Sequence, residues 1–183
     1  MSSKYKVADS TLPHFVTFSV VGWIDVFTRE QYKEIMMESL QYCMEHKGLT
    51  LHAWVIMTNH VHLIISSKTA ALQELVRDIK KFTSKQIIHA IEHNPEESRK
   101  EWMLNLFRYT GSTNKNNKEF QFWKQDYHPV ELSTNVLLDQ RINYLHENPV
   151  RSGLVWEAWH YKYSSAIDYY TNEKGLLKIE RLL

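Results

Sequence analysis

Polar and apolar positions alternate along three short stretches of the chain. β-branched and aromatic residues dominate these stretches, and a period of two is typical of strands with one buried face. The three predicted strands are residues 14–23, 49–57 and 60–67. Thr58 and Asn59 separate the last two stretches, which predicts a tight turn that joins them in a hairpin.

Longer stretches repeat apolar residues at every third or fourth position, which is the spacing of an amphipathic helix. Residues 29–47 and 70–94 show this pattern. They are followed by Gly48 and Pro95, two residue types at which helices commonly end. The sequence therefore predicts two long helices, one before the hairpin and one after it.

The C-terminal half of the chain is less regular. Residues 96–109 have a helical pattern, whereas residues 111–120 are rich in Asn and Lys and have the composition of a loop. We expect a fourth strand within residues 120–132. Residues 133–149 begin with Ser-Thr, a common N-cap, and are predicted to form a helix that ends at a proline.

This order of elements contains the β-α-β-β-α-β pattern of ferredoxin-like domains. We expect an α+β fold with a ferredoxin-like antiparallel sheet and helices on one face, which leaves the other face without helices. The length, with no internal repeat or linker, predicts a single domain over residues 1–183. Because this fold serves many functions, function has to be inferred from particular residues.

Composition narrows the class of protein. Hydrophobic residues make up 43% of the chain and charged residues 23%, which is typical of a globular protein. The net charge is only +1, so any binding to nucleic acid would depend on local patches. Cys43 is the single cysteine, which excludes an intrachain disulfide. No apolar segment suits a signal peptide or a membrane span, and we expect a cytoplasmic protein.

Two histidines stand one residue apart on the third predicted strand. Side chains at positions i and i+2 of a strand share a face, so His60 and His62 point together while Val61, Leu63 and Ile65 enter the core. The pair is either the polar edge of an ordinary sheet or half of a metal site. Two imidazoles alone bind a metal poorly, and a third ligand is needed.

The predicted helix at residues 133–149 offers that ligand. Tyr144 and Asn148 are four residues apart and share a helix face. An amide oxygen beside two imidazoles, with water or phosphate oxygens completing the shell, would suit Mg²⁺ or Mn²⁺. A phenol with the ordinary pKa of about 10 is only about 0.3% ionised at pH 7.5, so a tyrosine nucleophile needs such a cation. This combination fits covalent phosphoryl transfer. Asn148 could alternatively act as a helix C-cap.

Two segments resemble the motifs of a known superfamily. "AWVIMTNHVHLII" resembles the His-hydrophobic-His segment of single-tyrosine HUH transposases, and "INYLHENPVRSGLV" resembles their catalytic-tyrosine segment. The chain is most similar to the REP-associated tyrosine transposases of bacteria, and the similarity also covers "HFVTFSVVGWIDVF" and "FWKQDYHPVEL". Thr58 and Lys124 depart from the pattern, because such families usually have Pro and often Gln there.

The resemblance implies a ferredoxin-like enzyme that cuts and rejoins single-stranded DNA, often beside a hairpin. It implies a 5′-phosphotyrosine intermediate and a free 3′-hydroxyl. Carried onto this chain, His60, His62 and Asn148 would bind Mg²⁺ or Mn²⁺, and Tyr144 would be the nucleophile.

Several other side chains are candidates for contact with DNA. Basic residues form a stripe on the second long helix, and two more arginines lie close to the tyrosine in sequence. These candidates are Arg77, Lys80, Lys81, Lys85, Arg141 and Arg151. For the stripe, a solvated helix face is the simpler explanation. Four aromatic residues could stack on unpaired bases or pack in the core, and they are Trp123, Tyr127, Trp156 and Trp159.

Three functions remain open from the sequence. The first is the metal-dependent single-strand endonuclease and strand transferase. The second is an inactive or domesticated relative that binds a DNA or RNA hairpin without cutting it. The third is a two-histidine hydrolase with water as the nucleophile, for which a Tyr144→Phe variant would stay active. A homodimer and a monomer are both compatible with the sequence.

Overall fold

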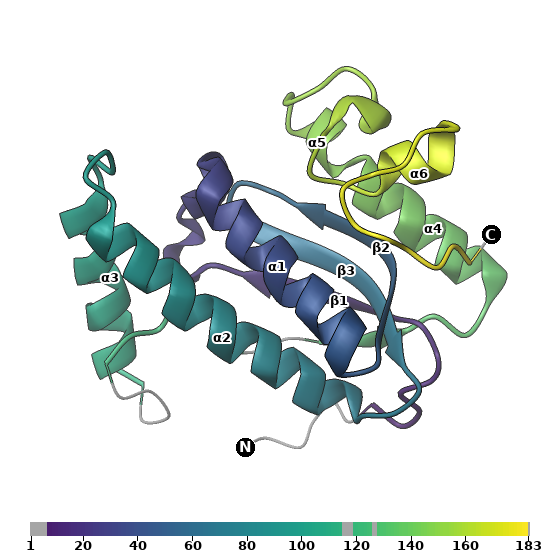
Figure 1. Ribbon diagram of the computed structural model, residues 1–183, viewed down its shortest axis with the longest axis horizontal. Helices are drawn as coiled ribbons and strands as arrows, with labels where there is room; N and C mark the ends of the chain where they lie inside the picture. Colours follow the sequence, from purple (N-terminus) through teal and green to yellow (C-terminus); the bar gives the residue numbers. More distant parts are fainter. Residues whose placement is uncertain (1–6, 115–118, 126–127, 183) are drawn as a thin grey trace.

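Four strands form one antiparallel sheet in the part of the chain that the structure describes (Figure 1). This computed structural model describes residues 7–114, 119–125 and 128–182. The strand order is β2-β3-β1-β4, which is the order that a β-α-β-β-α-β chain makes in a ferredoxin-like sheet. The strands are β1 (His14–Ser19), β2 (Leu49–Ile56), β3 (His60–Ser67) and β4 (Val130–Glu131).

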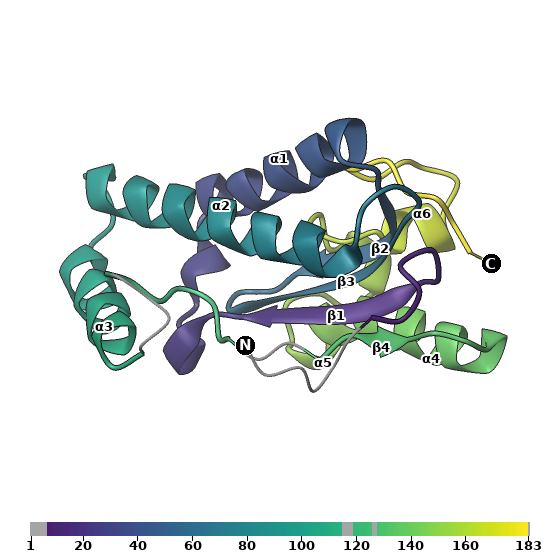
Figure 2. The same cartoon turned by 90° about the horizontal axis from the view of Figure 1, so that it is seen from below.

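Two long helices, α1 (Glu30–His46) and α2 (Leu72–His93), cover one face of the sheet (Figure 2). Their apolar stripes and the facing side chains of β1, β2 and β3 form the larger core. Val61, Leu63 and Ile65 lie in this core, as the alternation along β3 predicts. The helix α3 (Lys100–Ser112) follows α2 and lies at the far end of the molecule (Figure 1).

The helix α4 (Asn135–His146) lies against the opposite face of the sheet (Figure 2). Its residues Leu138, Ile142 and Leu145 recur at helical spacing and pack in a second core with Phe15 and Ile64 of the sheet. The ferredoxin-like α+β fold is therefore confirmed. The face expected to be free of helices nevertheless carries α4, because its strand positions are also apolar and need cover.

The first predicted strand is shorter than the sequence pattern indicates. It ends at Ser19 rather than continuing to residue 23, and a 3₁₀ turn follows at Val21–Trp23. Gly22 and Trp23 have φ angles of 64° and 56°, which lie in the left-handed region and interrupt the pleat. Glycine takes this conformation readily, whereas tryptophan rarely does.

The ends of α1, α2, β2 and β3 follow the predictions closely, but those of two other helices do not. The helix α3 begins four residues later and ends three residues later than the helix predicted at 96–109, so it extends into the predicted loop. The predicted helix at residues 133–149 is divided into α4 and the short α5 (Asn148–Arg151), because Pro149 has no N–H to continue the ladder. Thr134 is the N-cap of α4, and its side chain accepts from the Leu137 N–H at 3.2 Å. The fourth strand, expected within residues 120–132, consists of only two residues, Val130 and Glu131.

The C-terminal segment, which includes α6 (Ala166–Tyr170), joins the outer edge of β2. Val55 pairs with Ser164, and the backbone N–H of Glu180 donates to the carbonyl of Leu51 at 2.8 Å. These bonds cover an edge strand whose polar backbone groups would otherwise be exposed. Within the described ranges, no helix combines the length and apolarity that a membrane crossing requires.

Candidate active site

The two histidines of β3 and the tyrosine of α4 meet on the face of the sheet that α4 covers. The rings of His60 and His62 are 4.7 Å apart between centroids, and the ring of Tyr144 is 5.5 Å from that of His62. Phe15 of β1 stacks on His62 at 5.1 Å and meets Tyr144 edge-on at 6.0 Å. Residues far apart in sequence are thus brought into one cluster of rings.

Hydrogen bonds hold one nitrogen of each imidazole. Nδ1 of His62 lies 2.8 Å from Oγ1 of Thr17, its cross-strand neighbour on β1. Nδ1 of His60 lies 2.7 Å from Oδ1 of Asn59, whose amide nitrogen donates to the Trp23 carbonyl. Because an amide oxygen only accepts, Nδ1 of His60 carries the proton. The Nε2 atom then has the lone pair that can bind a metal.

The second nitrogen of His62 is buried without a partner. Its Nε2 atom has no hydrogen bond among the described residues. A buried polar atom of this kind is uncommon and calls for an explanation. A role as a metal ligand would explain it, because the other nitrogen of His62 is already hydrogen-bonded to the Thr17 hydroxyl.

Asn148 lies beside the histidines, as the helical spacing predicts. Its amide nitrogen donates to the Tyr144 carbonyl at 2.8 Å, so the alternative role as a helix cap is also real. This bond fixes which end of the amide is nitrogen, and the side chain is close enough to the His60 ring to affect its pKa. The remaining oxygen is the kind of ligand that Mg²⁺ and Mn²⁺ accept.

Burial keeps both imidazoles in the form that binds metals. Burial, together with smaller effects of the neighbouring His60 and the Arg141 guanidinium, lowers the pKa of His62 to about 3. Burial also lowers the pKa of His60, and the nearby Asn148 side chain acts in the opposite direction. Both side chains are therefore neutral at pH 7, which is the protonation state of a metal ligand.

These residues fit a divalent cation, with an amide as the third ligand. No group of three or more His, Cys, Asp or Glu side chains in the described ranges could hold a metal ion. A site made of His60, His62 and Asn148 consists of neutral donors only. Because Mg²⁺ and Mn²⁺ bind preferentially to anionic oxygen, a substrate phosphate would supply the missing charge.

Two of the predicted cations lie at this site. Arg141 is one helical turn before Tyr144, and its guanidinium carbon is 5.3 Å from the centre of the Phe15 ring. The Nε atom of Arg141 is buried and has no hydrogen-bond partner among the described residues. The Arg151 guanidinium lies 5.4 Å from the centre of the Tyr144 ring. Positive charge therefore flanks the tyrosine on both sides in sequence.

The four cations of α2 lie elsewhere, because α2 covers the opposite face of the sheet (Figure 2). Arg77 pairs with Asp78 at 3.1 Å, and Nζ of Lys80 donates to the Lys124 carbonyl at 2.7 Å. Lys81 and Lys85 are exposed. The structure does not bring this stripe to Tyr144, and its contact with DNA stays a prediction.

The aromatic candidates fall into different environments. Trp123 is buried in the larger core, which confirms the packing alternative for this residue. Trp156 is 92% exposed, and Trp159 is exposed to a lesser degree. Tyr127 lies outside the described residues.

Three residues at the site were missed by the sequence analysis. Thr17 and Asn59 hold the imidazoles, and Phe15 packs beneath His62. The sequence indicated only that Asn59 lies in a turn, and not that it contacts His60. No local signal identifies Thr17, because its role depends on its pairing opposite His62.

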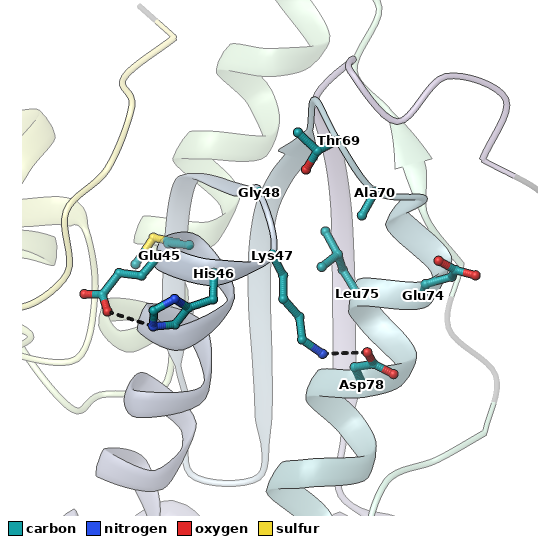
Figure 3. Close-up of a pocket in the computed structure, with 10 residues that line it drawn as sticks. Glu45, His46, Lys47, Gly48, Thr69, Ala70, Glu74, Leu75 and Asp78 are labelled. Carbon is teal, nitrogen blue, oxygen red and sulfur yellow. Dashed lines mark hydrogen bonds and ion pairs between the residues drawn. The ribbon is translucent and has the colours of Figure 1, made fainter.

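A hollow in the surface lies away from this cluster, between the end of α1 and the beginning of α2 (Figure 3). Lys47 and Asp78 form an ion pair of 2.7 Å across it. None of the predicted site residues lines this hollow, and we assign it no function.

Comparison with known families now adds to this geometry. Residues 14–118, more than half of the chain, match the family described as "Transposase IS200 like". The chain belongs to this family. The matched range contains the histidine pair of this transposase and ends before Tyr144. The relationship to transposases that the sequence motifs indicated is thus confirmed.

A solved structure shows the same fold. The REP-associated tyrosine transposase bound to a REP hairpin is 17% identical, and the alignment covers 100% of this chain and 99% of that chain with a TM-score of 0.63. A candidate transposase from Deinococcus radiodurans R1 is 16% identical over 79% of this chain and 95% of that chain, with a TM-score of 0.43. None of the curated proteins compared with this transposase matches it.

Proposed function

We propose that this transposase cuts and rejoins single-stranded DNA near hairpins, with Tyr144 as the nucleophile and a divalent cation bound by His60, His62 and Asn148. One observation carries the proposal. The Tyr144 ring lies 5.5 Å from the His62 ring, and Nε2 of His62 is buried without a partner in the described chain. A nucleophile beside a candidate metal ligand suits metal-assisted phosphoryl transfer.

The cleavage step exchanges one phosphoester bond for another. The phenolic oxygen of Tyr144 attacks the scissile phosphorus, and its proton passes to solvent. The bond from phosphorus to the 3′ oxygen breaks, and that oxygen takes a proton from solvent. The products are a 5′-phosphotyrosine and a free 3′-hydroxyl. Attack of a 3′-hydroxyl on the phosphotyrosine reverses these bond changes and rejoins DNA.

The residues of the chain have separate tasks in this step. Thr17 and Asn59 orient the imidazoles, and the Asn148–Tyr144 bond orients the amide. Arg141 and Arg151 place positive charge where the phosphate enters. A bound Mg²⁺ or Mn²⁺ would polarise a phosphate oxygen and stabilise charge in the transition state.

The choice of a hairpin substrate has independent support. The transposase with the same fold is bound to a REP hairpin. On this chain, Trp156 is an aromatic side chain that is almost fully exposed, and it follows α5, the element that begins with Asn148. Exposed aromatic and basic side chains next to a phosphoryl-transfer site are suited to unpaired DNA.

The test is a search for the covalent product. The protein is mixed with Mn²⁺ and single-stranded DNA hairpins copied from the DNA that flanks its gene. Denaturing gels detect an adduct, and peptide mass spectrometry locates it. The controls are Tyr144→Phe, which removes the nucleophile, and His60→Ala, which removes one ligand. An adduct on Tyr144 that disappears in both variants supports the proposal.

Other outcomes separate the alternative functions. Cleavage that persists in Tyr144→Phe would show a water nucleophile and refute the covalent mechanism. Tight binding of one hairpin with no cleavage in Mg²⁺ or Mn²⁺ would identify a relative that binds without cutting.

A further inference from the structure

Trp23 is an exposed tryptophan at the edge of the candidate active site. Its ring lies 6.2 Å from the His60 ring, and 56% of the residue is exposed. An exposed aromatic side chain alone has little meaning, because isolated ones are common on protein surfaces. Trp23 differs because its backbone is strained and its neighbours fix its position.

The strain lies in the backbone. Trp23 is the single non-glycine residue with a positive φ angle in the described ranges, at 56°. The left-handed conformation is unfavourable for a residue with a large side chain, and such outliers persist only when the surrounding structure holds them. A smaller residue would fit this turn with less strain, so packing alone does not account for tryptophan.

Asn59 and Lys124 hold Trp23 against the site. The Asn59 amide nitrogen donates to the Trp23 carbonyl at 3.3 Å, and the same amide accepts from Nδ1 of His60 at 2.7 Å. The Asn59 side chain thus connects the backbone of Trp23 to His60, a candidate metal ligand. The Lys124 ammonium lies 3.8 Å from the centre of the indole ring, close enough for a cation–π contact.

We propose that Trp23 is a positioning residue that stacks on an unpaired nucleobase next to the scissile phosphate. This inference rests on the function proposed above. A phosphate at the histidine pair would place the base of its own or an adjoining nucleotide several ångströms away, and the indole is an exposed ring at that distance on the His60 side. Stacking tolerates any base and fixes the register of the strand without reading sequence.

Lys124 adds a charge to the same place. Its ammonium lies over the indole ring, so it would put a positive charge within reach of the backbone phosphate of a stacked nucleotide. Trp23 and Lys124 together recognise the two parts of one nucleotide, an aromatic base and an anionic phosphate. Tyr144 and Trp23 contact different histidines, so the strand would run from the nucleophile across the pair to the indole.

The test removes the indole and the base in turn. The probes are the hairpin oligonucleotides from the flanking DNA, with one abasic site at each unpaired position near the cut. Fluorescence anisotropy in EDTA measures their binding to wild type and to Trp23→Ala, without requiring metal or cleavage. Loss of a stacked base is expected to weaken wild-type binding by about 5- to 150-fold at one position. The same abasic site should have no further effect on Trp23→Ala.

Matched variants make the result specific. Trp102 on α3 is exposed to nearly the same extent, at 55%, so Trp102→Ala should retain the full abasic effect. Trp23→Phe should recover part of the binding. Trp23→Asn, which suits the left-handed backbone, should bind as weakly as Trp23→Ala while melting no lower than wild type. Recovery by Phe and loss with an intact fold in Asn would support stacking.

The two proposals fail in different ways. If every abasic site has the same effect on wild type and on Trp23→Ala, the stacking role is wrong, even when the Tyr144 adduct forms. If Trp23 and one base are coupled but no adduct forms, the stacking role stands and the covalent function fails.

Discussion

The hydrogen bond between Thr17 and His62 gives a direct test of the metal site. Thr17→Val keeps the branched shape but removes the oxygen 2.8 Å from Nδ1 of His62. The imidazole would lose the bond that sets its orientation and tautomer. Removing such a partner of a metal ligand typically weakens metal affinity 10- to 100-fold, or about 1.4–2.7 kcal/mol. Leaving a buried N–H unpaired also destabilises a fold by about 1–3 kcal/mol.

Electron paramagnetic resonance measures the outcome without catalysis, because free Mn²⁺ in a titration has a strong signal of its own. We expect Thr17→Val to raise the Mn²⁺ dissociation constant by a factor within that range. Thr17→Ser keeps the hydroxyl and should stay close to wild type. Urea unfolding of the metal-free proteins gives the stability effect separately. A Thr17→Val protein that binds Mn²⁺ within twofold of wild type would refute the assignment of His62 as a ligand.

Three further predictions follow from the same geometry. Tyr144→Phe should abolish the adduct. It should change the free energy of unfolding by less than about 0.5 kcal/mol, because the Tyr144 hydroxyl has no hydrogen bond among the described residues. A large loss of stability in urea unfolding would contradict this. Arg141→Gln should weaken single-strand binding and flatten the plot of log affinity against log salt by about 0.7; an unchanged slope would exclude a phosphate contact. Burial lowers the pKa of His146 to about 3, whereas an unfolded histidine titrates near 6.5. The unfolded chain binds the extra proton between these values, so stability should fall by up to about 1.4 kcal/mol per pH unit below 6.5, and His146→Gln should remove that part of the slope.

The fold follows from the sequence where the signal is local. The alternation in residues 60–67 gives the bounds of β3 and the two faces of the strand correctly, because side-chain direction alternates along any strand. The end of β1 was placed wrongly, because Val20–Trp23 continues the apolar pattern while its backbone turns. The left-handed angle of Trp23 is imposed by tertiary contacts that no residue-type preference reports.

The candidate site shows the same division. The spacing of Tyr144 and Asn148 was sufficient to predict that they lie one turn apart, and the bond from the Asn148 amide to the Tyr144 carbonyl agrees with this. The helix break between them was not predicted, and Asn148 begins α5. Thr17 acts through its pairing with His62, and pairing partners cannot be read from one sequence. Lys80 and Lys81 look like Arg141 in sequence, yet they lie on the other face of the sheet, since the side that a helix covers depends on the whole topology.

The site residues divide into two sets with separate origins in the chain. The consecutive helices α4 and α5 carry Arg141, Tyr144 and Asn148, while the sheet and its turn carry the histidines and their hydrogen-bond partners. Exchange of the segment that contains α4 and α5 between related transposases would therefore transfer the nucleophile, an arginine and the amide ligand as one inherited unit. The recipient sheet would need to match only the apolar residues Leu138, Ile142 and Leu145. Recombination within this family could thus produce chimeric enzymes in which one parent supplies the histidines and the other the nucleophile.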